Sequence, residues 1–169
     1  MTDKQKLICE SMVPLIIGLR KYPNDSCFKH GLSKIIRRFT EYPADIGIPY
    51  MYSIGALRAA ENIGLSAEKL MWTGYLDQTT KRGLQDIGHG TGIFHHEHII
   101  PISQTIQRML KLEDLTAETL YNLLIENYKI AWILKSEQKI LDANNKSTIR
   151  TPELLNVLQI YIKGFNYND

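Results

Sequence analysis

The sequence predicts an α+β protein that is mainly α-helical, with a small β-β-α motif in its second half. Three observations support this fold class. Apolar residues recur at spacings of three and four in several segments, as in helices that bury one face. The segment 129–134 is instead dense in β-branched and aromatic residues, which favours a strand, and 94–100 ends in a strand-like apolar run before a proline. A segment with a good helix N-cap follows the second of these strands.

The first 88 residues are expected to form a helical region. Apolar positions in 3–22 follow the helical repeat, with Pro14 at a kink or a helix start. Asp25 or Ser26 is suited to cap a second helix that extends to Phe39, because short polar side chains accept hydrogen bonds from the first turn.

A connector at 42–49, with two prolines and a glycine, precedes a third helix over about 50–63. Gly64 is a plausible C-cap, and Ser66 opens a fourth helix. Within 56–75 the small residues and the glycine resemble a helix-turn-helix, in which the second helix would read DNA or mediate dimerisation. Ordinary packing of two helices predicts the same pattern.

The second half begins with a glycine-rich loop at 83–92. Capping residues and apolar spacing define the elements after this loop. The expected elements are a strand at 94–100, helices at 104–112 and 116–126, a strand at 129–134, a helix at 137–143 capped by Ser136, and a final helix at 151–162.

The length of 169 residues suits one domain, divided here into ranges 1–88, 89–145 and 146–169, the last packing on the core. With 44% hydrophobic and 22% charged residues, the composition is that of a soluble globular protein. The only two cysteines, Cys9 and Cys27, lack the spacing of a cysteine-type metal site. Two cysteines are also too few for a disulfide scaffold. No signal peptide or apolar run of membrane-spanning length is present, so a cytoplasmic location without a membrane partner is expected.

Histidine is concentrated in one place. Four of the five histidines fall between His89 and His98, and Glu97 lies among them before an apolar-apolar-proline sequence. Imidazole titrates near neutral pH and is a common metal ligand, so this stretch is the candidate site.

The run Glu97-His98-Ile99-Ile100-Pro101 resembles the first motif of the HNH (ββα-metal, His-Me finger) endonuclease family, which reads acidic-His-apolar-apolar-Pro. The strand and helix over 130–138 are similar to the second half of that motif. The resemblance covers residues 93–145. The zinc-binding cysteine pairs of many members are absent, and the segment between His98 and the second strand is long.

The resemblance implies roles for these residues. His98 would be the general base, and Glu97 would bind Mg²⁺ or Mn²⁺ together with Gln138, or with Glu137 if the alignment shifts by one residue. Glu137 would otherwise only favour the start of its helix. Asn127 would orient the base.

His95 and His96 are assigned supporting roles in packing, phosphate contact or hydrogen bonding. A different site chemistry is zinc binding by His89, His95, His96 and His98, although no third ligand at suitable spacing accompanies the pair His96 and His98 on one face of the strand. This zinc site is less favoured than Mg²⁺ or Mn²⁺.

The expected function is metal-dependent hydrolysis of DNA, in preference to RNA, as in a restriction or phage-related nuclease. A homodimer would be needed to cut both strands. Basic residues that would contact phosphates form local groups in a chain with a net charge of +2. They are Lys34, Arg37, Arg38, Lys69, Lys81 and Arg82. The alternatives are a helix-turn-helix regulator with structural histidines and a zinc-stabilised helical interaction protein.

Overall fold

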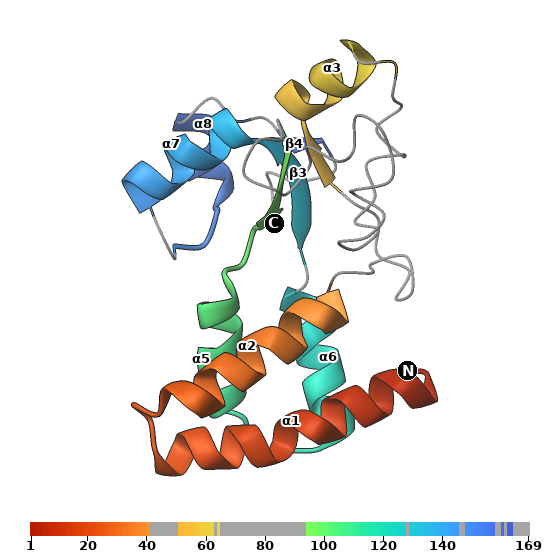
Figure 1. Cartoon of the computed structure of the whole chain (residues 1–169), viewed down its shortest axis with the longest axis vertical. Coiled ribbons are helices and arrows are strands. Elements are labelled where there is room, and N and C mark those ends of the chain that lie inside the picture. The colour runs from red at the N-terminus through yellow and green to blue at the C-terminus, as the bar shows by residue number, and fades with distance from the viewer. Residues whose placement is uncertain are drawn as a thin grey trace. The chain divides into compact units, whose positions relative to one another are not determined.

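The computed structural model describes residues 1–40, 51–62, 64, 94–127, 129–145, 148–157, 160 and 162–163. Helices account for most of these residues, and short strands form one small sheet (Figure 1). The predicted fold class, mainly helical α+β, is confirmed. None of the helices in these ranges has the length and apolar character required to cross a membrane.

The chain forms two compact units. The helical unit combines Met1–Gly47 with Ile100–Tyr128, and the sheet unit combines Ile48–Ile99 with Lys129–Asp169. This grouping differs from the three consecutive ranges expected from the sequence. The helices within residues 100–128 group with the N-terminal helices, because their apolar faces share one core.

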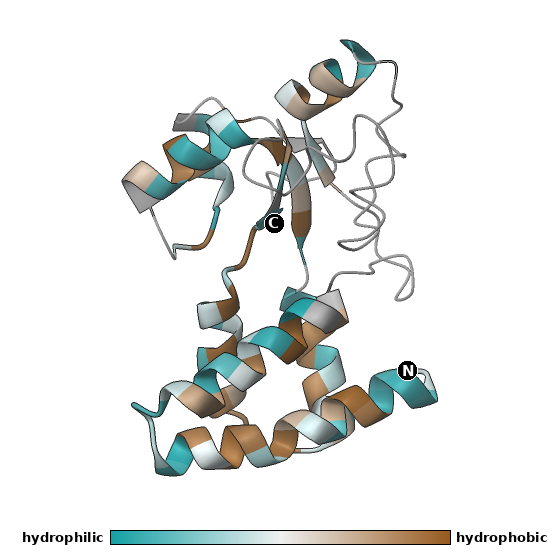
Figure 2. Ribbon diagram, in the orientation of Figure 1, coloured by the Kyte–Doolittle hydropathy of each residue, from teal (hydrophilic) through white to brown (hydrophobic). Residues whose placement is uncertain are grey.

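Four amphipathic helices make up the helical unit: α1 (Asp3–Lys21), α2 (Ser26–Thr40), α5 (Ile102–Leu110) and α6 (Ala117–Asn127). Figure 2 shows hydrophobic and hydrophilic residues alternating along α1 and α2, as expected of helices that bury one face. Pro14 lies inside α1. The buried core takes residues from all four helices: Cys9, Met12, Ile16, Leu19, Leu32, Ile36, Phe39, Ile102, Ile106, Met109, Leu120, Leu123 and Leu124.

Side-chain caps set the starts of these helices. Thr2 and Gln5 form a reciprocal capping box on α1, with distances of 2.7 and 3.2 Å. The Asp25 carboxylate accepts hydrogen bonds from the backbone of Cys27 and Phe28 at the start of α2. Of the two predicted candidates, Asp25 and Ser26, Asp25 is therefore the N-cap of α2. Thr116 likewise accepts from the backbone N–H of Thr119 in α6.

The sheet unit contains the predicted β-β-α order. Strand β2 (Phe94–His98) pairs antiparallel with β3 (Ile130–Leu134), and α7 (Lys135–Asn145) follows at once. Two further strands complete the sheet in the order β2-β3-β1-β4. Strand β1 (Met51–Ser53) is parallel to β3, and β4 (Ile162–Lys163) is antiparallel to β1.

These two short strands correct the sequence-based expectation, which placed both segments in helices. Helix α3 (Ile54–Asn62) begins only after β1, and α8 (Pro152–Val157) ends before β4. Strands of two or three residues carry no periodicity of their own. They exist through pairing with distant strands, which a local pattern does not reveal.

Helices cover both faces of the sheet. On one face α3 buries Ala56 and Ala60 against Phe94 and Trp132. On the other face, apolar residues of the sheet and its flanking segments pack with α7 and α8. This second cluster consists of Met51, Ile99, Ala131, Ile133, Leu141, Leu155 and Ile160.

The predicted C-cap of the third helix is present. Gly64 has a φ of 73°, and its N–H donates to the Glu61 carbonyl at 2.9 Å. The small residue Ala60 packs with Phe94 and Trp132 of the sheet. The second helix of the predicted helix-turn-helix, from Ser66, lies outside the described residues.

Arg20 ties α1 to the end of α5. Its Nε donates to the Leu110 carbonyl at 3.2 Å, and its Nη2 donates to the carbonyls of Met109, at 3.4 Å, and Leu112. The last carbonyls of a helix lack partners within it, and a cation there also favours the helix dipole.

We therefore expect Arg20→Ala to lower the free energy of unfolding of the helical unit by about 1–2 kcal/mol, the value of hydrogen bonds to a charged group discounted for exposure. Urea unfolding followed by circular dichroism measures this change. The matched control is Lys29→Ala, an exposed residue of α2, which should change stability by less than about 0.5 kcal/mol. Equal effects of the two substitutions would contradict the capping role.

Candidate functional site

Strand β2 places Glu97 and His98 next to each other but on opposite faces of the sheet. Glu97 is opposite Ala131 and His98 is opposite Ile130 on β3. Because side chains alternate along a strand, Glu97 shares its face with Ala131 and α7, whereas His98 shares the face of Phe94 and α3. His98 is half-buried.

The Glu97 carboxylate is buried, with 7% of the residue exposed, and both oxygens have partners. Oε1 accepts a hydrogen bond from Arg150 Nε at 2.9 Å, and Oε2 lies 3.2 Å from His95 Nε2. Burial alone would raise the pKa of Glu97. The hydrogen bond from His95 and the charge of Arg150 outweigh burial and hold the pKa below its usual value. Glu97 is therefore an ionised carboxylate inside the sheet unit.

Arg150 is one of two residues of the site, with Asp142, that the sequence analysis did not single out. It is 3% exposed, and its Nη1 donates to the Thr148 carbonyl at 3.0 Å. Its Nη2 lies 3.7 Å from Asp142 Oδ1 on α7. The backbone N–H of Arg150 also donates to the Ile99 carbonyl at 2.9 Å, just beyond β2. A single arginine between a polar segment and a helix start carries no recognisable sequence signal.

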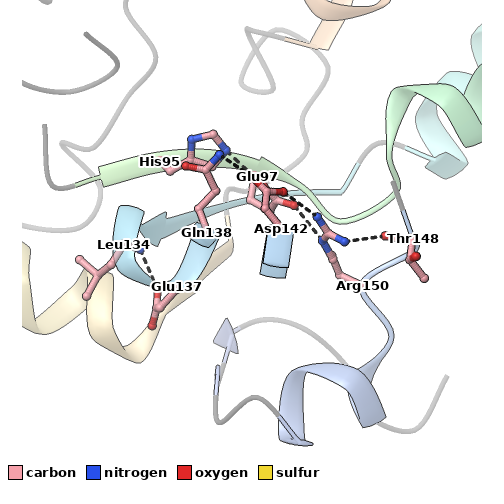
Figure 3. A network of polar contacts seen from close by, with 8 residues as sticks. All are labelled: His95, Glu97, Leu134, Glu137, Gln138, Asp142, Thr148 and Arg150. Atoms are coloured by element: carbon pink, nitrogen blue, oxygen red, sulfur yellow. Dashed lines mark hydrogen bonds and ion pairs between the residues drawn. The ribbon is translucent and has the colours of Figure 1, made fainter. Parts of the chain in front are cut away.

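Helix α7 adds two polar side chains. Gln138 Nε2 donates to Asp142 Oδ2 at 3.1 Å. Contacts thus run without interruption through five side chains from β2, α7 and the segment before α8 (Figure 3). We call this the polar network: His95, Glu97, Arg150, Asp142 and Gln138. The structure therefore brings together three predicted site residues, His95, Glu97 and Gln138.

Glu137 points elsewhere. Its Oε2 accepts from the Leu134 backbone N–H at 2.7 Å and from the Ser53 hydroxyl at 2.6 Å. The Ser53 Oγ in turn accepts from the Ala56 N–H at the start of α3, at 2.9 Å. A Cβ added to Gly55 would lie 2.6 Å from Glu137 Oε1. Glu137 therefore caps its own helix and joins it to the β1–α3 junction, and glycine is needed for this close approach.

Asn127 lies in the helical unit, at the end of α6. Its Nδ2 donates to the Leu123 carbonyl at 2.6 Å, and its Oδ1 accepts from Arg108 Nη1. Both ends of the amide thus have partners in the helical unit, whereas His98 belongs to the sheet unit.

The remaining predicted residues divide into two groups. Lys34 and Arg37 are exposed on α2, Arg38 belongs to the same helix, and His96 lies in β2. The others lie outside the described residues: Lys69, Lys81, Arg82 and His89.

The expected ligands do not form a metal site as they lie. Glu97 is engaged by two hydrogen-bond donors, and Glu137 is engaged at a different junction. Within the part of the chain that the structure describes, no group of three or more histidine, cysteine, aspartate or glutamate side chains is placed to hold one ion. The arrangement of Glu97 with Gln138 or Glu137 around a cation is therefore not the one observed.

Neither protein-family models nor curated proteins nor solved structures give a match to this chain.

Removing the Glu137 carboxylate is expected to cost about 1–2 kcal/mol in the free energy of unfolding, the value of a helix cap. Gly55→Ala should destabilise the wild type although alanine is the better helix former, because the new methyl group meets the carboxylate. In the Glu137→Ala background, the loss in the free energy of unfolding caused by Gly55→Ala should be smaller by about 1 kcal/mol or more. Urea unfolding of the four proteins measures the coupling, with Lys139→Ala as the surface control. Additive effects would contradict the contact.

The lowered pKa of Glu97 predicts how stability depends on pH. An unfolded glutamate titrates at about 4.3, so the stabilisation from ionised Glu97 is complete above that pH. It is lost as the pH falls through the lower pKa of the folded state, since protons then bind the unfolded chain more readily. The stability gap between wild type and Glu97→Gln should therefore be widest near neutral pH and narrow below about pH 4. Urea unfolding of both proteins from pH 7 to 3 measures this difference in stability. A difference independent of pH would refute the lowered pKa of Glu97.

Proposed function

We propose that this chain is a DNA endonuclease whose reaction centre lies at His98 in the sheet unit. The observation that supports this most is the arrangement of β2, β3 and α7, in which Glu97 and His98 occupy adjacent positions of an antiparallel pair followed by a helix. The order of these elements around the acidic-His motif supports the proposal, with Glu97 on the face of α7 and His98 on the face of α3.

In the proposed reaction His98 acts as the general base. A neutral imidazole can take a proton from water at neutral pH, and the water oxygen then attacks phosphorus. The new P–O bond forms as the bond to the leaving oxygen breaks, and that oxygen takes up a proton. His98 is half-buried, so its ring is held within the sheet unit.

Glu97 and Arg150 support this centre by fixing β2. Their ion pair anchors the strand to the segment before α8, and the next residue along the strand is His98. A phosphodiester reaction also requires positive charge near the phosphate, which the resemblance assigns to Mg²⁺ or Mn²⁺. Since the polar network as it lies has no metal site, no step is assigned to a cation there.

DNA is the proposed substrate, with RNA second. Lys34 and Arg37 are exposed on α2 of the helical unit and are proposed to contact phosphates, which position a duplex without reading its sequence. One centre per chain cuts one strand. Double-strand cleavage is therefore proposed to require a homodimer.

The test is cleavage of supercoiled plasmid with Mg²⁺ or Mn²⁺ by the full chain. His98→Ala should lower the rate by about 100-fold or more, the usual contribution of a general base. His30→Ala is the matched control, because His30 is exposed on α2 and should leave cleavage unchanged.

The outcomes separate the alternatives. Cutting that persists in His98→Ala would exclude His98 as the base. Binding of DNA without cutting would favour the helix-turn-helix regulator. Cutting that stops in EDTA would indicate a cation bound outside the polar network, such as one bound with the substrate.

A further inference from the structure

The Arg150 guanidinium lies between two carboxylates from different elements. Its Nε donates to Glu97 on β2 at 2.9 Å, and its Nη2 lies 3.7 Å from Asp142 on α7. The Thr148 carbonyl holds a third nitrogen at 3.0 Å. Figure 3 shows the guanidinium directed toward both acidic side chains. A positive charge is therefore bound between the strand and the helix of the β-β-α motif.

This charge makes the contacts that a divalent cation would require. Hard cations bind carboxylate and amide oxygens, and the oxygens available here belong to Glu97, Asp142 and Gln138. A guanidinium competes for the same lone pairs, and arginine stays protonated at every physiological pH. With Arg150 only 3% exposed, its release would leave the buried Glu97 carboxylate without its main counter-charge.

We propose that Arg150 takes the place of a divalent cation in this protein. The guanidinium neutralises Glu97, positions β2 against α7, and excludes Mg²⁺ and Mn²⁺ from the polar network. Arg150 is thus a positioning residue that acts through Glu97. This inference goes beyond the proposed endonuclease function and is independent of it, because it concerns cation binding in the absence of substrate.

Removal of the guanidinium should convert the polar network into a cation site. In Arg150→Met the side chain keeps much of its length but loses its charge and its donors. The Glu97 and Asp142 carboxylates, the His95 imidazole and the Gln138 amide oxygen then remain as donors on one side of the sheet. As they lie these side chains do not surround one ion, so they must move closer together when the guanidinium is gone. Mn²⁺ accepts both oxygen and imidazole ligands, so it is the appropriate probe.

The experiment titrates Mn²⁺ into the full chain without DNA, by calorimetry and by the Mn²⁺ electron paramagnetic resonance signal. Wild type and Arg150→Lys should bind no Mn²⁺ at the network. Arg150→Met should bind about one ion per chain with a dissociation constant of about 10⁻⁴ to 10⁻³ M, the range of weak oxygen-ligand sites. Arg150→Met/Glu97→Gln should lose that ion.

Thermal unfolding supplies a second readout. Mn²⁺ should raise the melting temperature of Arg150→Met but leave that of the wild type unchanged, because a ligand of the folded state stabilises it by mass action.

Two results would overturn the proposal. One is stoichiometric Mn²⁺ binding by the wild type that Glu97→Gln abolishes. The other is a folded Arg150→Met protein that binds no Mn²⁺. If Arg150→Met does not fold, the comparison of Mn²⁺ binding by wild type and by Glu97→Gln decides whether the polar network excludes the cation. Failure of the chain to cut DNA would refute the endonuclease function. The Mn²⁺ titrations would still test the role of Arg150, because they contain no DNA.

Discussion

The sheet unit depends on the ion pair between Glu97 and Arg150. A carboxylate at 7% exposure loses most of its hydration, and the sheet can contain it only if another charge compensates. Arg150 does so, and it is held in turn by the Thr148 carbonyl and by its own backbone bond to Ile99. The pair therefore holds the segment just before α8 against β2. Because the same guanidinium reaches Asp142, strand and helix share one counter-charge.

Glu137 and Gln138, the two alternative partners of Glu97 that the resemblance implied, serve different junctions. Glu137 and Gln138 are consecutive on α7, and consecutive residues of an α-helix point about 100° apart. Gln138 therefore turns toward Asp142 in the polar network, while Glu137 turns back to Leu134 and across to Ser53. The helix geometry alone makes it difficult for both to reach Glu97. One residue supports the network, and the other supports the β1–α3 junction.

Local signals were sufficient for much of the fold. The caps at Asp25 and Thr116 and the glycine at Gly64 act within one helical turn, so their residue types predict them. Strands β2 and β3 were also recognisable from their composition. Strands β1 and β4 were not, because each depends on partners far away in the chain. The grouping of α5 and α6 with α1 and α2 likewise follows from a shared core that no local window contains.

The candidate site shows the same division. The clustered histidines and Glu97 lie on one strand, as expected, and alternation along it assigned their faces. The role of Arg150 was not predicted, because it is 53 residues from Glu97 in the sequence. Its sequence neighbours also give no reason to single it out. Asn127 was chosen for its closeness in sequence to β3, but the boundary between the two units falls just after it.

That boundary bears directly on the proposed centre. The chain leaves the sheet unit after Ile99 and returns to it at Lys129, so Glu97 and His98 occupy the last ladder positions before the exit. Strand ends fray unless something closes them. Here the Ile99 N–H donates to the Lys129 carbonyl at 2.8 Å, and the Ile99 carbonyl accepts from Arg150. The insertion of residues 100–128, which belong to the helical unit, between paired strands is thus compatible with a fixed His98, because both backbone groups of the exit residue are bound within the sheet unit.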